Sequence, residues 1–304
     1  MKRHRHFLPC FFLFLFPILL LGCAEMVQVG TTIGAGMGKI SPEEKERLDR
    51  MAAATAKAVR PMTEREEYYV GRAVAATILS QYRLYTYQPS TRYLNEVGQA
   101  VALASDRPLT YGGYHFAILD TQEVNAIACP GGIIFITRGA LHSAANEEEL
   151  AAILAHEVAH VNHKDGLASI QRARWVEAVS LMGGEAAQQL GGANLAKLVS
   201  LFQGSVNDVV KTILVNGYSR EQEMAADSAA LLILPRLRYD PYGLTDFLER
   251  IAQEQKGRSQ KGIFSTHPGV PERLAAARAT IAEKKWTRLD HRVRDQRFRQ
   301  FIRP

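Results

Sequence analysis

From Ser41 onwards, apolar residues recur at the three- and four-residue spacing of helices that bury one face. Thr63-Glu-Arg-Glu66 has the pattern of a capping box, in which each end residue binds the other's backbone N–H group. It predicts a helix that runs towards Tyr82, and residues 90–104 predict another. The first part of the chain after Ser41 is therefore expected to be mainly helical.

The pattern changes after Pro108, where three short segments rich in β-branched and aromatic residues predict strands. These segments are His115–Leu119, Val124–Ala128 and Ile133–Thr137, and Pro130-Gly-Gly132 predicts the turn between the last two. The expected fold is thus α+β, mainly α-helical, with a small sheet. An exposed edge strand could hold a peptide by backbone pairing, but a hairpin that is only core fits the sequence equally well.

A further helix is predicted directly after this sheet. Asn146 suits the N-cap, Glu149 completes a capping box, and two more glutamates suit the positive end of the helix dipole. Apolar residues then recur at helical spacing and predict a stripe that faces the core: Leu150, Leu154, Val158 and Val161.

This helix contains His156-Glu157-Val-Ala-His160, an H-E-x-x-H motif. Residues four apart share one face of a helix, so both imidazoles can bind a single metal ion. Glu157 lies beside them and can take a proton from the attacking water instead of binding the metal. The alternative is an amphipathic helix whose histidines are ordinary polar residues. A third ligand is needed to decide.

A candidate third ligand follows about sixty residues later. Ser219 and Gln222 form a capping box that begins a helix predicted to end at Pro235. Glu223 and Asp227 share a face of this helix, so Glu223 can bind the metal while Asp227 orients a ligating imidazole. Alone, the pair fits a solvated acidic face. Together with the two histidines, it makes Glu223 the predicted third ligand.

The metzincin version of the motif is excluded. It needs glycine three residues after the second histidine and histidine six residues after it, whereas those positions hold His163 and Gly166. His163 is instead predicted to lie on the surface at the end of the helix. The pattern of two histidines and a distant glutamate remains.

The first 22 residues have the composition of an export signal. A basic start precedes an apolar run over residues 7–21, which is shorter than the roughly 20 residues of a membrane-spanning helix. Leu20-Leu-Gly-Cys23 resembles a bacterial lipobox, which implies cleavage after Gly22 and lipid on Cys23. An uncleaved signal anchor is the alternative. Ala24 is not the aspartate that favours inner-membrane retention, so the likeness to lipoprotein sorting rules favours the outer membrane.

Cleavage of the signal removes Lys2, Arg3 and Arg5, so the formal net charge of the chain falls from +6 to +3. Cys129 is then the only cysteine besides Cys23, which excludes an internal disulfide, and we expect it to be a buried small apolar residue. Residues 23–60 are interpreted as a lipidated flexible tether with a leading helix, residues 61–285 as the folded domain and residues 286–304 as a basic tail.

Two other segments leave alternatives open. Charged residues interrupt every apolar run between Trp175 and Val215, which excludes a membrane span and leaves packing helices, a flap or a bilayer-surface segment. Residues 284–304 carry a formal charge of +6 with interleaved aromatic residues. This tail could bind an anionic membrane or lipopolysaccharide, or be disordered and solvated. The export signal argues against nucleic acid as a partner.

Four motifs together resemble the HtpX/CAAX-prenyl-protease family of gluzincin metallopeptidases, over roughly residues 60–285. They are His156-Glu-Val-Ala-His160, Asn125-Ala-x-Ala-x-Pro-Gly-Gly132, Ser219-Arg-x-x-Glu223-x-x-Ala-Asp227, and Thr266-His-Pro268 with Arg273. The resemblance implies a zincin-like fold and one zinc ion on His156, His160 and Glu223, with Glu157 as catalytic base and the His267 loop near the metal. The sequence departs from the family at His163-Lys-Asp165-Gly166, where many relatives carry Arg-His-Gly.

His267 precedes Pro268 in a predicted loop and has three interpretations. It could donate a hydrogen bond to the developing oxyanion, occupy the open metal position, or be an ordinary loop histidine.

With the lipobox, the chain is most similar to the family's periplasmic lipoprotein branch, which includes BepA and LoiP. The predicted function is a zinc endopeptidase that acts on misfolded or envelope proteins in the bacterial periplasm. The alternatives are a non-catalytic or dual-role chaperone for outer-membrane proteins, and a structural lipoprotein that binds no zinc.

Overall fold

The structure is a computed structural model that describes residues 32, 35–37, 40–49, 61–170, 192–254 and 263–302. These residues belong to two units, one formed by residues 1–61 and 175–201 and one by residues 62–174 and 202–304. In the first unit, residues 42–49 are helical, and Ser41 and Glu44 cap that helix reciprocally. The helical pattern predicted from Ser41 is confirmed there. The second unit holds the predicted site.

The sheet of the second unit has three strands, β1 (His115–Leu119), β2 (Ala126–Cys129) and β3 (Ile133–Thr137), in the order β1-β3-β2. β1 runs parallel to β3. β2 pairs antiparallel with β3, and the short 3₁₀ turn η2 (Pro130–Gly132) connects these two strands. Gly131 and Gly132 have φ values of 77° and 104°, which favour glycine. All three predicted strands and the turn are confirmed, although the second strand begins at Ala126 instead of Val124 and ends at Cys129 instead of Ala128.

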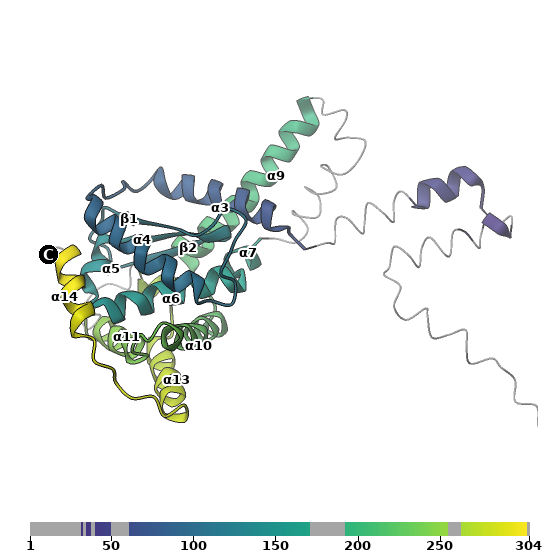
Figure 1. Ribbon diagram of the computed structural model, residues 1–304. Helices are drawn as coiled ribbons and strands as arrows, with labels where there is room; N and C mark the ends of the chain where they lie inside the picture. The colour runs from purple at the N-terminus through teal and green to yellow at the C-terminus, as the bar shows by residue number, and fades with distance from the viewer. Residues whose placement is uncertain are drawn as a thin grey trace, which may run out of the picture. The chain divides into compact units, whose positions relative to one another are not determined.

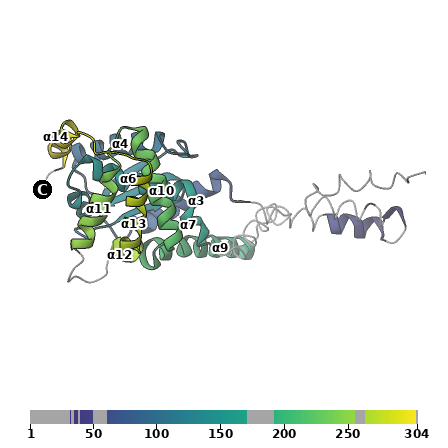
Figure 2. The same ribbon diagram turned by 90° about the horizontal axis from the view of Figure 1, so that it is seen from below.

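Helices cover both faces of this sheet (Figure 1, Figure 2). α4 (Gln88–Leu103) and α6 (Glu147–His163) pack against one face, and α3 (Glu64–Leu79) packs against the other with the end of α9 (Gly192–Lys211). The strands are therefore apolar on alternate positions of both faces: Ile134 and Ile136 belong to the first core, and Ile127 and Phe135 to the second. The predicted helices at 63–82 and 90–104 correspond to α3 and α4, and Thr63 and Glu66 form the predicted capping box.

α6 is the central element of the unit. α10 (Arg220–Arg236) and α11 (Tyr242–Glu254) pack on its side away from the sheet, and α13 (Val270–Glu283) packs on these two helices (Figure 1, Figure 2). The predicted stripe from Leu150 to Val161 is buried, but 15 of the 17 residues of α6 are buried. The sequence predicted that one face of α6 is buried, whereas nearly the whole helix is buried, because helices that lie far along the chain cover its other faces.

Two helix termini differ from the prediction. Asn146 caps α6 by accepting the N–H of Glu149, but the Glu149 carboxylate accepts the N–H of Ala145 and binds Arg250 instead of closing a capping box. α10 begins at the predicted Ser219–Gln222 capping box and continues to Arg236, so Pro235 lies in its last turn and does not end it. The remaining elements are α5 (Arg138–Ser143), α7 (Asp165–Ala168), the π-helix η4 (Thr212–Asn216), α12 (Ile263–Thr266) and α14 (Arg292–Phe301).

Residues Arg292–Phe301 of the basic tail form the packed helix α14, which contradicts the alternative of a disordered, solvated tail for this part of it. In α14, Phe298 is buried and the ring of Phe301 stacks on Tyr93 with centroids 5.2 Å apart. Arg297 and Arg294 pair with the buried carboxylates of Glu147 and Glu148 in the first turn of α6. Sequence reasoning missed this because the partner carboxylates lie about 150 residues away.

We expect Phe298→Ala to lower the free energy of unfolding by about 3 kcal/mol, since it removes a buried ring from the contact between α14 and Tyr93. Val293→Ala in the same helix is the matched control, because Val293 is 77% exposed. Urea unfolding curves measure both variants. Equal stability of the two variants would show that α14 is not docked in solution.

Four predictions fall wholly or partly outside the described residues. The signal at 1–22 and the lipidation of Cys23 lie outside them, as do most of the tether predicted at 23–60 and residues 175–191 of the segment from Trp175 to Val215. Among the helices of the described ranges, none has the length and apolar content needed to span a bilayer.

Candidate active site

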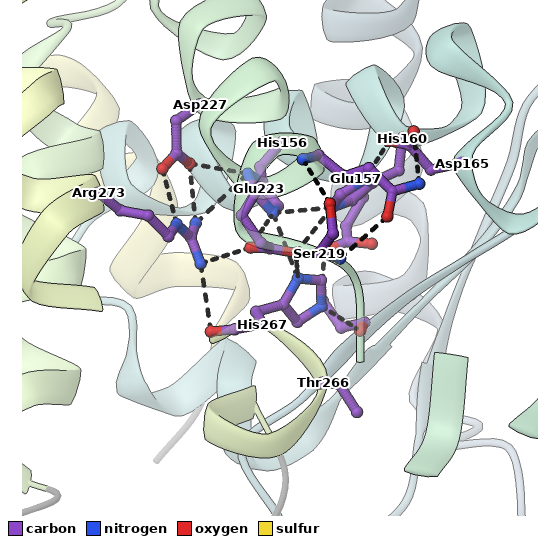
Figure 3. Close-up of polar contacts among 12 residues, drawn as sticks. His156, Glu157, His160, Asp165, Ser219, Glu223, Asp227, Thr266, His267 and Arg273 are labelled. Atoms are coloured by element: carbon purple, nitrogen blue, oxygen red, sulfur yellow. Dashed lines mark hydrogen bonds and ion pairs between the residues drawn. The ribbon is translucent and has the colours of Figure 1, made fainter. Parts of the chain in front are cut away.

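The predicted site residues converge on one buried point of the second unit (Figure 3). α6 contributes His156, Glu157 and His160, and α10 contributes Glu223, all at most 5% exposed. His267, from the loop between α12 and α13, is also buried. Residues from three parts of the chain, more than a hundred positions apart at the extremes, therefore meet here.

Each motif histidine is held by a carboxylate at its Nδ1 atom. Asp227 Oδ1 lies 2.8 Å from His156 Nδ1, and Asp165 Oδ2 lies 2.7 Å from His160 Nδ1. With Nδ1 donating, the Nε2 lone pair of each ring is available as a ligand. The two Nε2 atoms face each other at 3.0 Å.

Glu223 and His267 complete the group of potential ligands. Glu223 Oε2 lies 3.4 Å from His156 Nε2, and Glu223 Oε1 lies 3.4 Å from His160 Nε2. His267 Nδ1 lies 3.0 Å from Glu223 Oε1 and 3.3 Å from His156 Nε2. Ligands of a tetrahedral zinc ion, with bonds of about 2.0–2.1 Å, lie about 3.3 Å apart. The donor types and their spacing therefore fit zinc.

Arg273, on α13, joins the two acidic residues of α10. Its guanidinium binds Asp227 in bidentate fashion at 2.7 and 2.8 Å, and its Nη1 atom lies 2.6 Å from Glu223 Oε2. Burial would raise the pKa of Asp227, but Arg273 and His156 outweigh it and lower that pKa to about 2. Burial would also raise the pKa of Glu223, but His267 and His156 hold it well below its usual range, so both carboxylates stay ionised. The Ser-Arg-x-x-Glu-x-x-Ala-Asp motif and Arg273 form one electrostatic unit.

The carboxylate of Glu157 has few polar contacts within the described part of the chain. Its Oε1 atom lies 3.6 Å from His267 Nε2, and Oε2 accepts no hydrogen bond there. A buried carboxylate with an unpaired oxygen next to the ligand group is suited to accept a proton.

Cys129 is fully buried nearby, as predicted, and burial together with Glu157 raises its pKa, so the thiol stays protonated.

The sequence matches the model of peptidase family M48 over residues 88–281, which is more than half of the chain. The chain belongs to peptidase family M48. Since M48 peptidases are metal-dependent, this membership identifies a metalloendopeptidase and is consistent with the cluster of His156, His160, Glu223 and His267.

Three curated relatives of this M48 chain illustrate the range of the family. The beta-barrel assembly-enhancing protease of Escherichia coli (strain K12) is 25% identical over 259 residues, covering 82% of this chain and 51% of the relative. The mitochondrial metalloendopeptidase OMA1 of Schizosaccharomyces pombe is 28% identical, with coverages of 65% and 56%. The metalloprotease YcaL of Escherichia coli (strain K12) is 27% identical, with coverages of 56% and 63%. The chain thus spans about half the length of the first of these relatives.

The M48 domain holds the His267 loop against the free edge of β2. The backbone N–H of Ile263 donates to Val124 O at 2.9 Å, and His267 Nε2 lies 3.4 Å from Ala126 O. Thr266 Oγ1 also donates to the Asn125 side chain at 3.1 Å. The hypothesis of an exposed edge strand is therefore wrong for β2, because all four of its residues are buried.

Asp165 is a residue of the site that sequence reasoning missed. It lies where this M48 chain departs from the Arg-His-Gly of many relatives. Lys164 ends α6 in the left-handed conformation, which returns the chain so that Asp165 reaches back to His160. The sequence contained a signal for this role, because Asp165 is a carboxylate five positions after the second histidine, at the predicted end of the helix. His163 is exposed, as predicted.

Asp165→Asn is expected to weaken zinc affinity about 10–100-fold, because the carboxylate fixes the His160 ring and increases its basicity. Competition with a zinc-binding dye measures the affinity. Asp106→Asn is the matched control, since Asp106 is exposed and pairs with Arg236 at the surface. An unchanged zinc affinity in Asp165→Asn would contradict this role.

Proposed function

We propose that this M48 metalloendopeptidase uses zinc, held by His156, His160 and Glu223, to hydrolyse peptide bonds of misfolded or envelope proteins in the bacterial periplasm. The observation that carries the metal assignment is the convergence of the two Nε2 atoms and the Glu223 carboxylate at separations of 3.0–3.4 Å. Nitrogen and carboxylate donors in this number are those of catalytic zinc sites.

Each residue of the site has a separate task in the proposed mechanism. Zinc, when bound, supplies Lewis-acid activation of the scissile carbonyl and of water. Glu157 takes the proton of the attacking water and passes it to the leaving amine, so it ends each cycle as a carboxylate. Asp227 and Asp165 keep both Nδ1 atoms protonated, and Arg273 keeps Asp227 ionised and pairs with Glu223.

His267 is proposed to occupy the fourth ligand position in the resting state. Its Nδ1 atom lies at ligand spacing from Glu223 and His156, and its ring is 3% exposed. His267→Ala separates this role from oxyanion stabilisation. Faster peptide cleavage at unchanged zinc content supports a blocking ligand, and a lower kcat contradicts it.

Metal analysis of the purified chain tests the proposed function. We expect about one zinc per chain, loss of zinc and of casein cleavage together after chelation, and recovery of both with zinc but not with magnesium, which prefers oxygen ligands. His156→Gln and Glu223→Gln should each bind less than one equivalent. Cleavage by the zinc-free protein would overturn the proposal.

The location is a separate part of the proposal and depends on the lipobox at residues 20–23. Lipid on Cys23 would anchor the chain to the periplasmic face of the outer membrane. The relative named beta-barrel assembly-enhancing protease supports an envelope role. Fractionation of cells that express wild type or Cys23→Ser tests this, and wild type that stays soluble would contradict it.

A further inference from the structure

Tyr218 is fixed beside the site by the backbone that precedes α10. Gly217 has a φ of 76°, and a Cβ atom there would lie 2.3 Å from Ser265 O, so only glycine allows this approach. The N–H of Tyr218 donates to Thr266 O at 3.1 Å. The start of α10 is thus held against the segment that carries His267.

The ring of Tyr218 packs directly on a predicted zinc ligand. It stacks on His160 with centroids 4.1 Å apart and planes at 22°, and its centroid lies 5.9 Å from that of His267. The residue is 5% exposed. Its aromatic ring therefore forms one wall of the ligand group.

The hydroxyl of Tyr218 is a buried donor that makes no hydrogen bond to any described residue. The packing of Tyr218 does not require a hydroxyl, because the other residues of the second core are apolar, among them Cys129, Val209 and Ile213. A phenylalanine would fill this place without burying an unpaired polar group. A buried hydroxyl without a hydrogen-bond partner destabilises the fold, so its presence calls for a functional explanation.

The position of the phenol indicates its role. Its ring lies against His160 and near His267, so the unpaired hydroxyl belongs to the surroundings of the ligand group. Glu157 Oε2, the unpaired acceptor described above, is thus accompanied in the same site by an unpaired donor. Hydrolysis needs both, an acceptor for the proton of water and a donor for the carbonyl oxygen that gains charge.

We propose that Tyr218 is a further catalytic residue, whose hydroxyl donates a hydrogen bond to the oxyanion that develops on the scissile carbonyl. The inference deepens the proposed peptidase function and rests on it. Tyr218 transfers no proton, because the proton of water travels through Glu157 to the leaving amine. His267 is then not required as the oxyanion donor.

Tyr218→Phe tests this with little structural change, since the ring that stacks on His160 remains. We expect kcat to fall about 10²-fold, KM and zinc content to stay within about twofold, and the melting temperature to stay equal or rise. Calorimetry with a phosphinic peptide, which mimics the tetrahedral state, should show affinity weakened by a similar factor. This second readout does not depend on turnover.

Tyr114→Phe is the matched control, because Tyr114 is equally buried but donates to Arg107 O and Asn162 outside the ligand group. Unchanged kcat and unchanged phosphinic-peptide affinity in Tyr218→Phe would overturn the inference while the peptidase assignment stands. Zinc lost from Tyr218→Phe would also overturn it, in favour of a structural role at His160. A wild-type chain without zinc and without cleavage overturns the proposed function itself.

Discussion

Glu157→Gln is expected to lower the kcat of peptide cleavage about 10²–10⁴-fold, while the protein keeps one zinc per chain. Glutamine has nearly the same shape but cannot accept a proton. Because Glu157 is not among the residues at ligand spacing, zinc content should stay the same. Cleavage of a fluorescent casein and metal analysis of the same preparation measure the two quantities.

The matched control for this variant is Glu96→Gln, an exposed carboxylate of α4, which should cleave like wild type. Undiminished proteolysis by pure, zinc-loaded Glu157→Gln would remove Glu157 from the mechanism. The variant also separates the two functional hypotheses. If it restores the envelope of a deletion strain as well as wild type does, the chaperone function gains support, and substrates trapped on it can then be identified.

Arg273→Ala is expected to lower the free energy of unfolding of the zinc-free protein by about 3–5 kcal/mol. The guanidinium is buried and compensates two buried carboxylates, so its loss leaves Asp227 without its bidentate partner. Bound zinc compensates Glu223 and should reduce the loss. Urea unfolding of both forms measures the effect.

Arg278→Ala is the matched control, because Arg278 lies on the same helix but forms its ion pair with Glu249 at the surface. It should change stability by at most about 0.5 kcal/mol. Acid provides a second check. The lowered pKa of Asp227, about 2, stabilises the fold above the ordinary value of about 4, and this contribution disappears as pH falls towards 2. The stability difference between wild type and Arg273→Ala should shrink over that range, and a constant difference would contradict the role of Asp227.

Local spacing predicted those parts of the fold that depend on neighbours in sequence. The capping boxes at Thr63 and Ser219 correspond to helix starts, the three strands are where β-branched runs lie, and the i,i+4 pairs project from one face of α6 or α10. The convergence of Glu223 with His156 and His160 could be predicted because metal binding restricts the chemistry and spacing of its ligands. The metal itself stays a prediction.

What the sequence did not reveal depends on contacts between distant segments. The stripe on α6 gave no sign that its polar face is also buried, because α10, α11 and α14 supply the cover. Arg294 and Arg297 looked solvated because their carboxylate partners, Glu148 and Glu147, lie in α6. The free edge of β2 looked available because nothing local indicates that residues 263–267 lie against it.

The contacts of the first turn of α6 bear on the order in which parts of the protein fold. Glu147 is fully buried and accepts hydrogen bonds from Tyr93, Tyr239 and Arg297, and Arg297 lies 150 residues further along the chain. Such long-range contacts form late, because closing long loops costs entropy before the contact is gained. A chain whose α14 has not yet packed on α6 would therefore carry His156 on an incompletely buried helix. We therefore expect the protease to become active only after α14 has packed on α6, and an incompletely folded chain to be inactive.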